Sequence, residues 1–373
     1  MATSTATKRI APPKRLLYGP GPSMVEPRAY EALAQPVVGL RDPYFLEVMS
    51  EIQAGLRQAF GTRNERTYMV PAGGGGAMEA AVASFVEPKS KFLIFTAGVF
   101  AERMAVAAER QRAQVTRIEK PPGEVFNEAE AAEAIARVDP DSIAFVQAET
   151  STGAYQSGRN ITSAANQTGA LVIADTVTSL GAMPVELDAV GIDVAFSCSQ
   201  KGLSCPAGLA PISISNRAWD KLQARRETPF TWYLDVQAMA KYFDPPHAYH
   251  HTPSPPLYYA MHQALAVIEE EGLEQRWNRH RRAGERLVSG LVKLGFEPFV
   301  KEPEHRIWHV TTVVPPAGLD EARLRQRLFD NHSIEIASGL GALAGKILRI
   351  GTMGPLATEG HVDGLLEAIE TSL

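Results

Sequence analysis

The sequence contains little cysteine, no long apolar run and no cluster of one charge sign. Its 373 residues include two cysteines, Cys198 and Cys205, and no C-x-x-C pair, so neither a disulfide framework nor a cysteine-based zinc site is predicted. We expect both thiols to be free and buried, in a reducing compartment, the cytoplasm. No apolar run approaches the roughly 20 residues of a membrane-spanning helix, so no membrane partner is expected.

Acidic and basic residues nearly balance along the chain. The net charge is −5, and no long basic run is present, which argues against a nucleic-acid partner and against anionic membranes. Residues 1–15 are basic and free of acid but lack the apolar core of a secretory signal. Two close prolines disfavour the helix of a transit peptide, the alternative, so we expect residues 1–20 to form an N-terminal arm.

Short, continuously apolar runs predict buried strands. Such runs are typical of parallel strands that helices cover on both faces. Helix-like segments, 76–86, 101–111 and 127–138, lie between or beside them, and this alternation predicts an open α/β sheet. The predicted strands are residues 91–96, 142–149, 170–175, 193–197 and 210–215.

The pattern changes after about residue 255. Residues 257–295 are helix-like, and shorter strand-like runs follow at 308–315, 333–339 and 346–351. A chain of this length is too long for one simple core. We therefore expect a large domain over residues 21–256 and a smaller α+β domain over residues 257–373.

Polar residues follow several of the predicted strands. Asp175 ends the strand 170–175, Lys201 follows the strand 193–197, and "ETSTG" (149–153) ends the strand 142–149. In α/β sheets the ligand binds at the carboxyl ends of the strands. The sequence therefore predicts that these residues share one edge of the sheet.

A glycine-rich segment, "PAGGGGAMEAA" (71–81), precedes one of the predicted helices. Free N–H groups at a helix N-terminus make a phosphate site. The segment is neither a P-loop nor a G-x-G-x-x-G dinucleotide motif. A flexible turn is the alternative, so the glycines alone indicate no more than a phosphate site.

Asp175 and Lys201 define the chemistry more closely. A buried acid needs a partner, which for Asp175 is a metal, a ribose or a buried cation. No companion ligands for a metal are found, and a ribose-binding acid is expected about 20 residues after the glycines. Lys201 has no charged neighbour between Asp193 and Arg217, and apolar surroundings lower the pKa of a lysine and make it nucleophilic.

A phosphate cradle, a buried acid and an isolated lysine together match the needs of pyridoxal phosphate. The lysine forms the Schiff base, and the acid pairs with the pyridinium nitrogen so that the ring can accept electrons. An aromatic side chain is expected to stack on the ring, and Phe100 is placed for this role.

The sequence resembles the fold-type I, class V pyridoxal-phosphate-dependent aminotransferases, and within them the alanine–glyoxylate and serine–pyruvate group. The resemblance runs from about residue 17 to the end of the chain and keeps the order of every segment. The segments that carry it are "YGPGPSMV" (18–25), "GTRNERT" (61–67), "ETSTGAYQ" (149–156), the run 174–208 around "SQKG", "PFTWYLD" (229–235), "YHHTPS" (249–254), 299–318 and "GKILRIGTMG" (345–354).

The resemblance implies a role for each matching position around the cofactor. Lys201 corresponds to the Schiff-base lysine and Asp175 to the pyridinium partner. The other implied cofactor contacts are Gly74, Gly75 and Gly76 in the phosphate cradle, Gln200 at the phosphate, Val177 beneath the ring, Phe100 on the ring and Thr150 at the phenolic oxygen.

Three further positions are implied for the substrate and for a second subunit. Arg349 of "LRIG" corresponds to the arginine that holds the substrate α-carboxylate through its planar fork. Tyr249 and Thr252 of "YHHT" correspond to residues that reach the phosphate in the other subunit, which implies a homodimer with shared active sites.

The chain also departs from its relatives. The animal enzymes have tryptophan in place of Phe100 and a Gly-His pair in place of Gly74-Gly75. Phenylalanine still stacks, and loss of the histidine opens space near the phosphate. "GLRDPYF" (39–45) departs from the "HRSP" pattern of many relatives, and we expect Arg41 to form a pair on the surface rather than to approach a second acidic group of a substrate.

The resemblance implies a ping-pong transfer of an amino group from a small L-amino acid, alanine or serine, to glyoxylate or pyruvate. Ureidoglycine and aspartate are alternative donors. A cysteine desulfurase needs a mobile C-terminal thiol, and no cysteine follows Cys205. A non-catalytic relative would lack Lys201 or Asp175, and the glycine pattern argues against a nicotinamide-dependent oxidoreductase.

Overall fold

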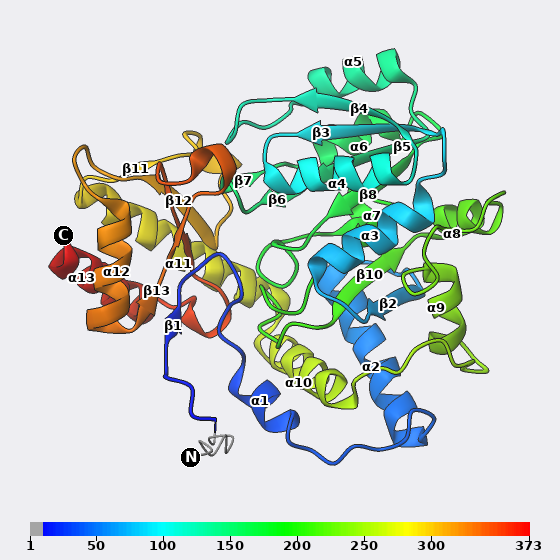
Figure 1. Cartoon of the computed structure of the whole chain (residues 1–373), viewed down its shortest axis with the longest axis horizontal. Helices are drawn as coiled ribbons and strands as arrows, with labels where there is room; N and C mark the ends of the chain where they lie inside the picture. Colours follow the sequence, from blue (N-terminus) through cyan, green and yellow to red (C-terminus); the bar gives the residue numbers. More distant parts are fainter. Residues whose placement is uncertain (1–9) are drawn as a thin grey trace, which may run out of the picture.

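The protein is built around a seven-stranded sheet with the order β2-β10-β9-β8-β5-β3-β4. The structure is a computed structural model that describes residues 10–373, and Figure 1 shows its course. The expected α/β fold and every predicted strand are present. The strands are β2 (Arg66–Val70), β3 (Lys91–Thr96), β4 (Gln114–Glu119), β5 (Ser142–Val146), β8 (Leu171–Asp175), β9 (Val194–Phe196) and β10 (Ala210–Ile214).

One strand runs against the rest. We predicted residues 210–215 as a parallel strand, and this direction is wrong, because β10 pairs antiparallel with both β2 and β9. The chain returns from β9 through the loop 197–209 without a helix, and a return without a crossover places the next strand antiparallel. That loop carries Lys201, so the reversal keeps the lysine at the edge where β9 ends.

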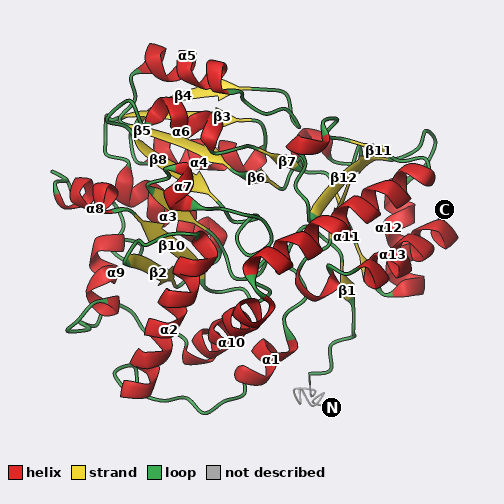
Figure 2. Ribbon diagram, turned by 180° about the vertical axis from the view of Figure 1, so that it is seen from behind, coloured by secondary structure: helices red, strands yellow, loops and turns green. Residues whose placement is uncertain are grey.

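Helices cover the sheet on both faces. Right-handed crossovers place the helices of β2→β3 and β3→β4 on one face and those of β4→β5 and β5→β8 on the other, because the chain reverses direction across the sheet at β4. Accordingly α3 contacts α4, and α5 contacts α6, on opposite sides of the sheet in Figures 1 and 2. These helices are α3 (Gly74–Phe85), α4 (Val99–Arg110), α5 (Glu128–Val138) and α6 (Arg159–Ala165).

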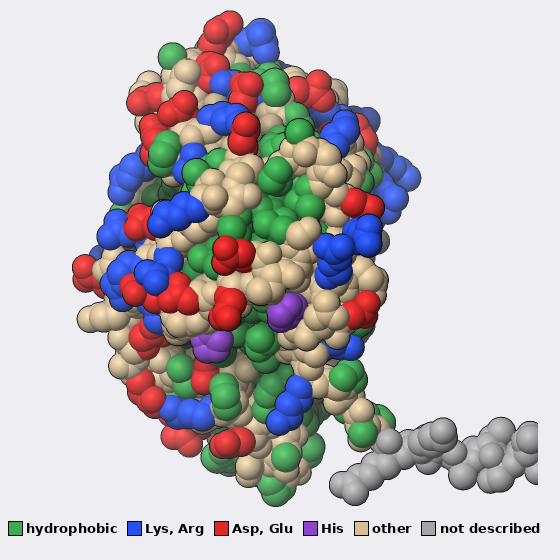
Figure 3. Space-filling view, turned by 90° about the vertical axis from the view of Figure 1, so that its left-hand side faces the viewer, with side chains coloured by type: hydrophobic (Ala, Val, Ile, Leu, Met, Phe, Trp, Pro, Cys, Tyr) green, Lys and Arg blue, Asp and Glu red, His purple; other side chains and the backbone are tan. Residues whose placement is uncertain are grey.

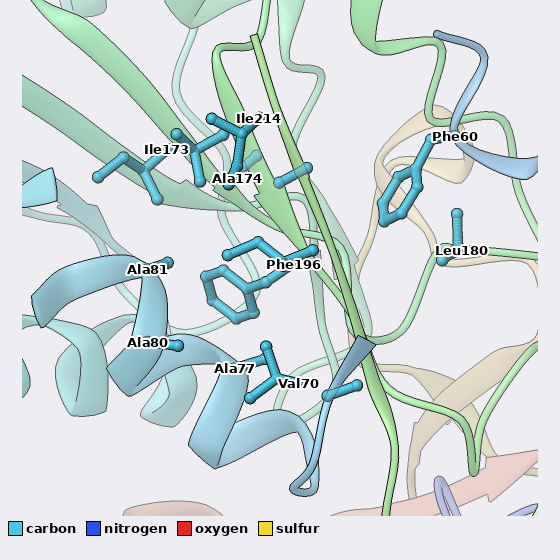
Figure 4. Close-up of a cluster of buried hydrophobic side chains, with 14 of the residues drawn as sticks. Phe60, Val70, Ala77, Ala80, Ala81, Ile173, Ala174, Leu180, Phe196 and Ile214 are labelled. Atoms are coloured by element: carbon cyan, nitrogen blue, oxygen red, sulfur yellow. The ribbon is translucent and has the colours of Figure 1, made fainter. Parts of the chain in front are cut away.

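The main core lies between the sheet and these helices. Figure 4 shows Phe196 of β9 pointing at Ala77 and Ala80 of α3, with Ile173 and Ile214 on neighbouring strands. All five side chains are fully buried. Alanines on the inner face of α3 let the helix lie close to the sheet, and this holds the glycines at the start of α3 near the strand ends.

Further elements complete the large domain. They are α1 (Pro27–Ala32), α2 (Pro43–Phe60), α7 (Leu187–Val190), α8 (Asn216–Gln223), α9 (Val236–Phe243) and the small β6–β7 hairpin, Ala148–Glu149 with Ala154–Tyr155.

The small domain has its own core and its own sheet, with the order β11-β12-β15-β14. The strand bounds are β11 (Glu297–Pro298), β12 (Val310–Val314), β14 (Ala337–Ser338) and β15 (Leu348–Gly351), and the helices are α11 (Leu273–Lys293), α12 (Glu321–His332) and α13 (Glu359–Ser372), with the short 3₁₀ turns η1 (Pro303–His305), η2 (Gly341–Leu343) and η3 (Gly354–Leu356).

The boundary between the two hydrophobic cores lies later in the chain than the domain boundary expected between residues 256 and 257. Helix α10 (Pro255–Glu271) packs against α1 and α2, and its buried side chains belong to the large core. Gly272, with a φ of +80°, separates α10 from α11. The residue that divides the two cores is therefore Gly272, because the predicted 257–295 helix breaks there and only its second half packs in the small domain.

The predicted N-terminal arm is partly described, since its residues 1–9 lie outside the described range. Within the rest, β1 (Leu16–Leu17) pairs in parallel with β13 (Ile334–Glu335). Tyr18 is buried in the core of the small domain. The described part of the arm is thus attached to the small domain, and residues 21–26 cross from it to the large one.

The small domain presents a surface of mixed charge. Figure 3 shows acidic and basic side chains interspersed over this side of the molecule. Arg286 and Arg282 of α11 pair with Asp363 and Glu359 of α13, at 2.5 Å and 3.9 Å. Among the helices of residues 10–373, none has the length and apolar character that would let it cross a membrane.

Candidate active site

The carboxyl ends of four parallel strands meet at one edge of the large sheet. β3, β5, β8 and β9 run in the same direction, and they are followed by residues 97–100, 149–153, Asp175 itself and Lys201. The prediction that these segments share one edge is confirmed. The adjacent order of β8 and β9 brings the loops after Asp175 and before Lys201 side by side.

Lys201 lies buried among hydroxyl groups, with 8% of its surface exposed. Its Nζ makes hydrogen bonds of 2.9 Å to Thr178 Oγ1 and 3.2 Å to Thr150 Oγ1. Burial lowers the pKa of Lys201, and this outweighs the opposing effect of nearby Asp175. Nζ also lies 5.6 Å from the ring centroid of Phe100. The site therefore holds an amine biased toward its neutral, nucleophilic form beside an aromatic face.

Asp175 ends β8 and is 5% exposed. One of its oxygens accepts a 2.8 Å hydrogen bond from the N–H of Val177. Burial raises the pKa of Asp175 to about 7, although Val177 N–H and Lys201 act in the opposite direction. Asp175 and Lys201, both in the described part of the chain, are not hydrogen-bonded to each other. A buried carboxyl in this state is suited to a cationic partner that enters from outside the chain.

The glycine-rich segment opens α3 as predicted, with Gly73 as the N-cap. The first N–H groups of a helix have no partner within it, so the start of α3 offers donors to an anion. A Cβ added to Gly74 would lie 3.0 Å from Val177 Cγ2 and 3.3 Å from Cys198 Cβ, and one on Gly76 would lie against Ala72. A Cβ on Gly75 would meet nothing within 4 Å, so the space beside this residue is open.

Two residues beside this cradle were predicted to contact a cofactor. Gln200 Oε1 is buried and has no hydrogen-bond partner within the described chain. Val177 is partly buried, packs against the large core and lies beneath Gly74. The side-chain NH₂ of Gln200 also has no hydrogen-bond partner within the described chain, and this donor, unlike the buried acceptor Oε1, is the group that suits the predicted phosphate contact.

Arg349 reaches the site from β15 of the small domain and is 7% exposed. Its Nε donates to Ser338 O at 2.7 Å and its Nη1 donates to Thr150 O at 3.2 Å, while Nη2 makes no hydrogen bond within residues 10–373. Burial lowers the pKa of this guanidinium. Thr150 thus contacts both Lys201, through its hydroxyl, and Arg349, through its carbonyl oxygen.

Tyr249 and Thr252 are not joined to this site within the subunit. Their hydroxyl groups lie 2.9 Å apart, and neither bonds to the site residues described above. Tyr249 is 61% exposed. Arg41 is exposed, as expected, but the surface ion pair expected for it is not formed within the described chain.

The structure adds residues that the sequence analysis did not assign to the site. Ser23 Oγ donates to the carbonyl oxygen of Lys201 at 2.8 Å, and a Cβ on Gly21, whose φ is +134°, would lie 3.0 Å from Lys201 Cε. Both belong to "YGPGPSMV", which marked the resemblance without a stated role. Thr178, whose hydroxyl is the nearest to Lys201 Nζ, lies three residues after Asp175, in the run 174–208 that carried the resemblance without a stated role for this residue.

Glu149 is a further buried acid beside the site. Its carboxylate accepts hydrogen bonds from the N–H groups of Phe100 and Ala101 at 3.1 Å and 3.3 Å, and from Ser151 N–H at 3.0 Å. It therefore caps the start of α4 from another strand end, and this fixes the backbone that carries Phe100.

A cavity of about 800 Å³ lies next to these residues, between the two domains. Lys201, Asp175 and Arg349 do not line it, so the cavity does not contain the reactive amine. It is lined by side chains of α3 and α4, by Ser151 and Thr152, and by Leu340, Ala342 and Leu343 of the small domain.

The family model "Aminotransferase class-V" matches residues 29–363. The chain belongs to this family of aminotransferases, and it is a transaminase. Its fold is that of the fold-type I enzymes, with a mainly parallel sheet domain and a smaller α+β domain. The resemblance seen in the sequence is therefore confirmed.

Individual relatives match over nearly the whole chain. The structure of alanine–glyoxylate aminotransferase from Nostoc sp. is 43% identical with a TM-score of 0.96, and covers 98% of this chain and 97% of its own. Alanine–glyoxylate aminotransferase of Oryctolagus cuniculus is 37% identical over 98% of this chain and 94% of its own length. The structure of ureidoglycine–glyoxylate aminotransferase from Bacillus subtilis is 35% identical with a TM-score of 0.96, and covers 98% of this chain and 94% of its own.

Proposed function

We propose that this aminotransferase uses pyridoxal phosphate to move an amino group from alanine or serine to glyoxylate or pyruvate. The observation that carries the proposal is Lys201, a buried amine with lowered pKa that lies beside an aromatic ring, close to an acid of raised pKa and to the start of a glycine-rich helix. Two kinds of relative are named for glyoxylate as a substrate, and both share the fold over nearly their full lengths.

The residues present fit the proposed cofactor. A Cβ on Gly74 would lie tightly against Val177 and Cys198, and the side-chain amide of Gln200 has no partner in residues 10–373, so its NH₂ group would be available to a phosphate oxygen. The start of α3 would hold the phosphate, Asp175 would hold the protonated ring nitrogen, and Thr150 would hold the phenolic oxygen. Phe100 and Val177 would enclose the ring. When bound, the cofactor supplies the aldehyde carbon that takes the amino group and a ring that accepts electrons.

Lys201 has two tasks in such a reaction. Its Nζ would hold the cofactor covalently, for which the neutral amine is required. In its free form, Nζ would take the proton from the donor α-carbon and return it later. The lowered pKa of Lys201 serves both tasks, because each needs an available lone pair.

Arg349 is proposed to bind the α-carboxylate of the donor and of the acceptor. Two of its donors are already fixed to Ser338 O and Thr150 O, which orients the plane of the guanidinium. The remaining Nη2 is available for a carboxylate oxygen. A planar, pre-oriented fork loses little freedom when it binds a carboxylate.

The identity of the donor has two alternatives. Ureidoglycine is the donor of the Bacillus subtilis relative, and aspartate also carries an α-carboxylate that Arg349 would hold. A lyase acting on cysteine is a further alternative, but no cysteine follows Cys205 to act as a mobile thiol. Alanine is favoured because relatives named for it match at 43% and 37% identity, and serine remains the second expected donor.

A homodimer with shared active sites is the second part of the proposal. Four large aromatic side chains are exposed together on two segments near the "YHHT" motif: Phe230, Trp232, Tyr233 and Tyr249. A second copy that covers them would bury apolar area and would place Tyr249 and Thr252 at its phosphate site.

Mixing two variants tests the shared site. Lys201→Ala lacks the reactive amine, and Tyr249→Ala lacks the residue given to the neighbour. If sites are shared, unfolding and refolding the two together forms hybrids that contain one intact site, and activity returns. If the mixture stays as inactive as its parts, or if sedimentation shows a fully active monomer, the shared site is refuted.

The aminotransferase itself is tested with Lys201→Ala and Lys201→Arg. We expect the purified wild-type protein to bind pyridoxal phosphate covalently, with a visible absorbance that borohydride reduction fixes to Lys201. Both variants should lose this absorbance and nearly all turnover. A panel of amino acids, scored by the loss of absorbance, then ranks alanine and serine against ureidoglycine and aspartate. A Lys201→Ala protein that keeps full turnover would overturn the proposal.

A further inference from the structure

Thr178 is the hydroxyl group nearest to the reactive amine, and neither sequence reasoning nor the family resemblance gave it a role. Its Oγ1 lies 2.9 Å from Lys201 Nζ, closer than Thr150 Oγ1 at 3.2 Å. Thr178 is 2% exposed, so water does not readily replace this contact. The two hydroxyl oxygens lie 3.5 Å apart, on neighbouring strand ends.

The two oxygens together determine the direction of the lysine lone pair. A neutral amine nitrogen has four directions, occupied by Cε, two N–H bonds and one lone pair. When the two N–H bonds point at Thr178 and Thr150, the lone pair takes the only direction that remains. With one of the oxygens removed, the amine rotates about the Cε–Nζ bond and its lone pair is no longer fixed.

The backbone of Thr178 is itself held by the small domain. His309 Nε2 donates a 2.7 Å hydrogen bond to the carbonyl oxygen of Thr178. A carbonyl only accepts, so the ring proton resides on Nε2 and Nδ1 is bare. Burial lowers the pKa of His309 to about 3, so the ring stays neutral at ordinary pH. His309 is fully buried beside β12, and its own carbonyl oxygen accepts from Thr352 N–H at 2.9 Å.

We propose that Thr178 is a positioning residue that aims the lone pair of free Lys201 at the α-carbon of the donor, and that His309 holds Thr178 in place. The inference rests on the proposed function. It adds to that function a role for the small domain, which contacts Thr178 through His309 and so acts on Lys201. β12, which follows His309, pairs with β15, which carries Arg349, so the strands that hold the substrate carboxylate also orient the base.

Several other groups act on Lys201 and bear on any measurement of its protonation. These groups lie on the elements that surround Lys201. Thr178 is uncharged, so its substitution leaves the charges of these groups unchanged. The groups are Asp175, Cys198, Glu149, Arg349 and His309.

The test compares Thr178→Val, which has the same shape without the hydroxyl, with Thr178→Ser, which keeps it. Thr162→Val is the matched control, because Thr162 is equally buried and its hydroxyl bonds only to Val190 O. With alanine and glyoxylate, we expect Thr178→Val to lower kcat about 10-fold or more, since misplacement of a reacting group slows a proton transfer. KM for alanine should stay unchanged, because Arg349 is untouched. The deuterium isotope effect from alanine labelled at Cα should rise.

A second readout does not depend on turnover. The full-length protein freed of cofactor is mixed with pyridoxal phosphate, and the rate of covalent attachment is followed against pH. Loss of one acceptor destabilises the ammonium form of Lys201, so the pH midpoint of this rate should fall by about 1 unit in Thr178→Val. Thr178→Ser and Thr162→Val should keep the wild-type midpoint, kcat and isotope effect.

The outcomes separate this inference from the proposed function. If wild-type protein neither attaches pyridoxal phosphate nor transaminates, the proposed function fails. If the wild type does both and Thr178→Val matches it in kcat and isotope effect, the positioning role is overturned, whether or not the midpoint shifts. If Thr178→Val does not fold, the decision rests on Thr178→Ala, with the same expected direction and the same refuting result.

Discussion

The guanidinium of Arg276 donates a 2.9 Å hydrogen bond to the carbonyl oxygen of Gly202, the residue that follows Lys201. The same guanidinium donates at 2.9 Å to the carbonyl oxygen of Gly181, in the loop that follows Asp175. Arg276 is almost completely buried on α11, and Glu271 balances its charge at 2.9 Å. One buried arginine therefore fastens together the two loops that carry the reactive amine and the buried acid.

Arg276→Met is expected to destabilise the protein and to loosen its cofactor. The substitution leaves two buried carbonyl oxygens without donors and removes a partner of Glu271, so the free energy of unfolding should fall by about 3 kcal/mol. Urea denaturation and the rate of cofactor loss measure the two effects. Arg282→Met is the control, because Arg282 and Glu359 form an exposed pair at 3.9 Å worth less than about 1 kcal/mol. Equal effects of the two substitutions would contradict the role given to Arg276.

Asp175→Asn is expected to change how the stability of the cofactor-free protein depends on pH. Burial raises the pKa of Asp175 from 3.8 to about 7, so in this interval the folded protein holds a proton that the unfolded chain has released. The stability of the wild type therefore falls as pH rises from 4 to 7, and the asparagine variant escapes this loss. The variant should be more stable above pH 7, by up to about 4 kcal/mol, and nearly equal at pH 4.

Urea denaturation at pH 5 and pH 8 checks this difference. Asp139→Asn serves as the control, because Asp139 is exposed and its side chain is 88% accessible. In the loaded enzyme the advantage of Asp175→Asn should shrink, since the ring nitrogen supplies a cationic partner, and turnover should be largely lost. A difference that is the same at both pH values would show that Asp175 is not a buried acid of raised pKa.

Gly74→Ala and Gly75→Ala are expected to differ although the residues are adjacent. The added methyl at position 74 meets Val177 and Cys198 at 3.0 Å and 3.3 Å, whereas at position 75 it meets nothing within 4 Å. Gly74→Ala should weaken the binding of pyridoxal phosphate by about 10-fold or more, because it pushes Val177 toward the ring. Gly75→Ala should bind nearly as the wild type does. Titration of the cofactor-free variants with pyridoxal phosphate measures both affinities. Equal affinities for the two variants would count against the proposed cradle.

Arg349→Lys is expected to raise KM for α-amino acids and to spare cofactor binding. A lysine lacks the fork that Ser338 O and Thr150 O orient, and the charge-assisted hydrogen bonds lost are worth a factor of about 10 to 100 in affinity. Steady-state kinetics with alanine measure the change, and an amine donor without a carboxylate should show no such change. An unchanged KM for alanine would remove Arg349 from the substrate site.

The sequence by itself determined the sheet and most of the residues near the amine. Continuous apolar runs predicted the core strands, because strands buried on both faces have no polar side to show. The polar residues at the ends of these runs identified Asp175 and Lys201, because the ligand of an α/β sheet binds at the carboxyl ends of its strands. The resemblance then added Arg349 and gave a role to Thr150, which the position of "ETSTG" at a strand end had already placed at this edge of the sheet.

Only the tertiary structure decided which groups touch one another. The antiparallel direction of β10, the division of the cores at Gly272 and the attachment of Tyr18 to the small domain depend on packing between segments far apart in sequence. Thr178, His309 and Arg276 carried no motif that marked them. Their roles come from distances of 2.7 to 2.9 Å to Lys201 and to the backbone around it. The contact of Thr178 joins two loops of the large domain, and those of His309 and Arg276 form only when the small domain meets these loops.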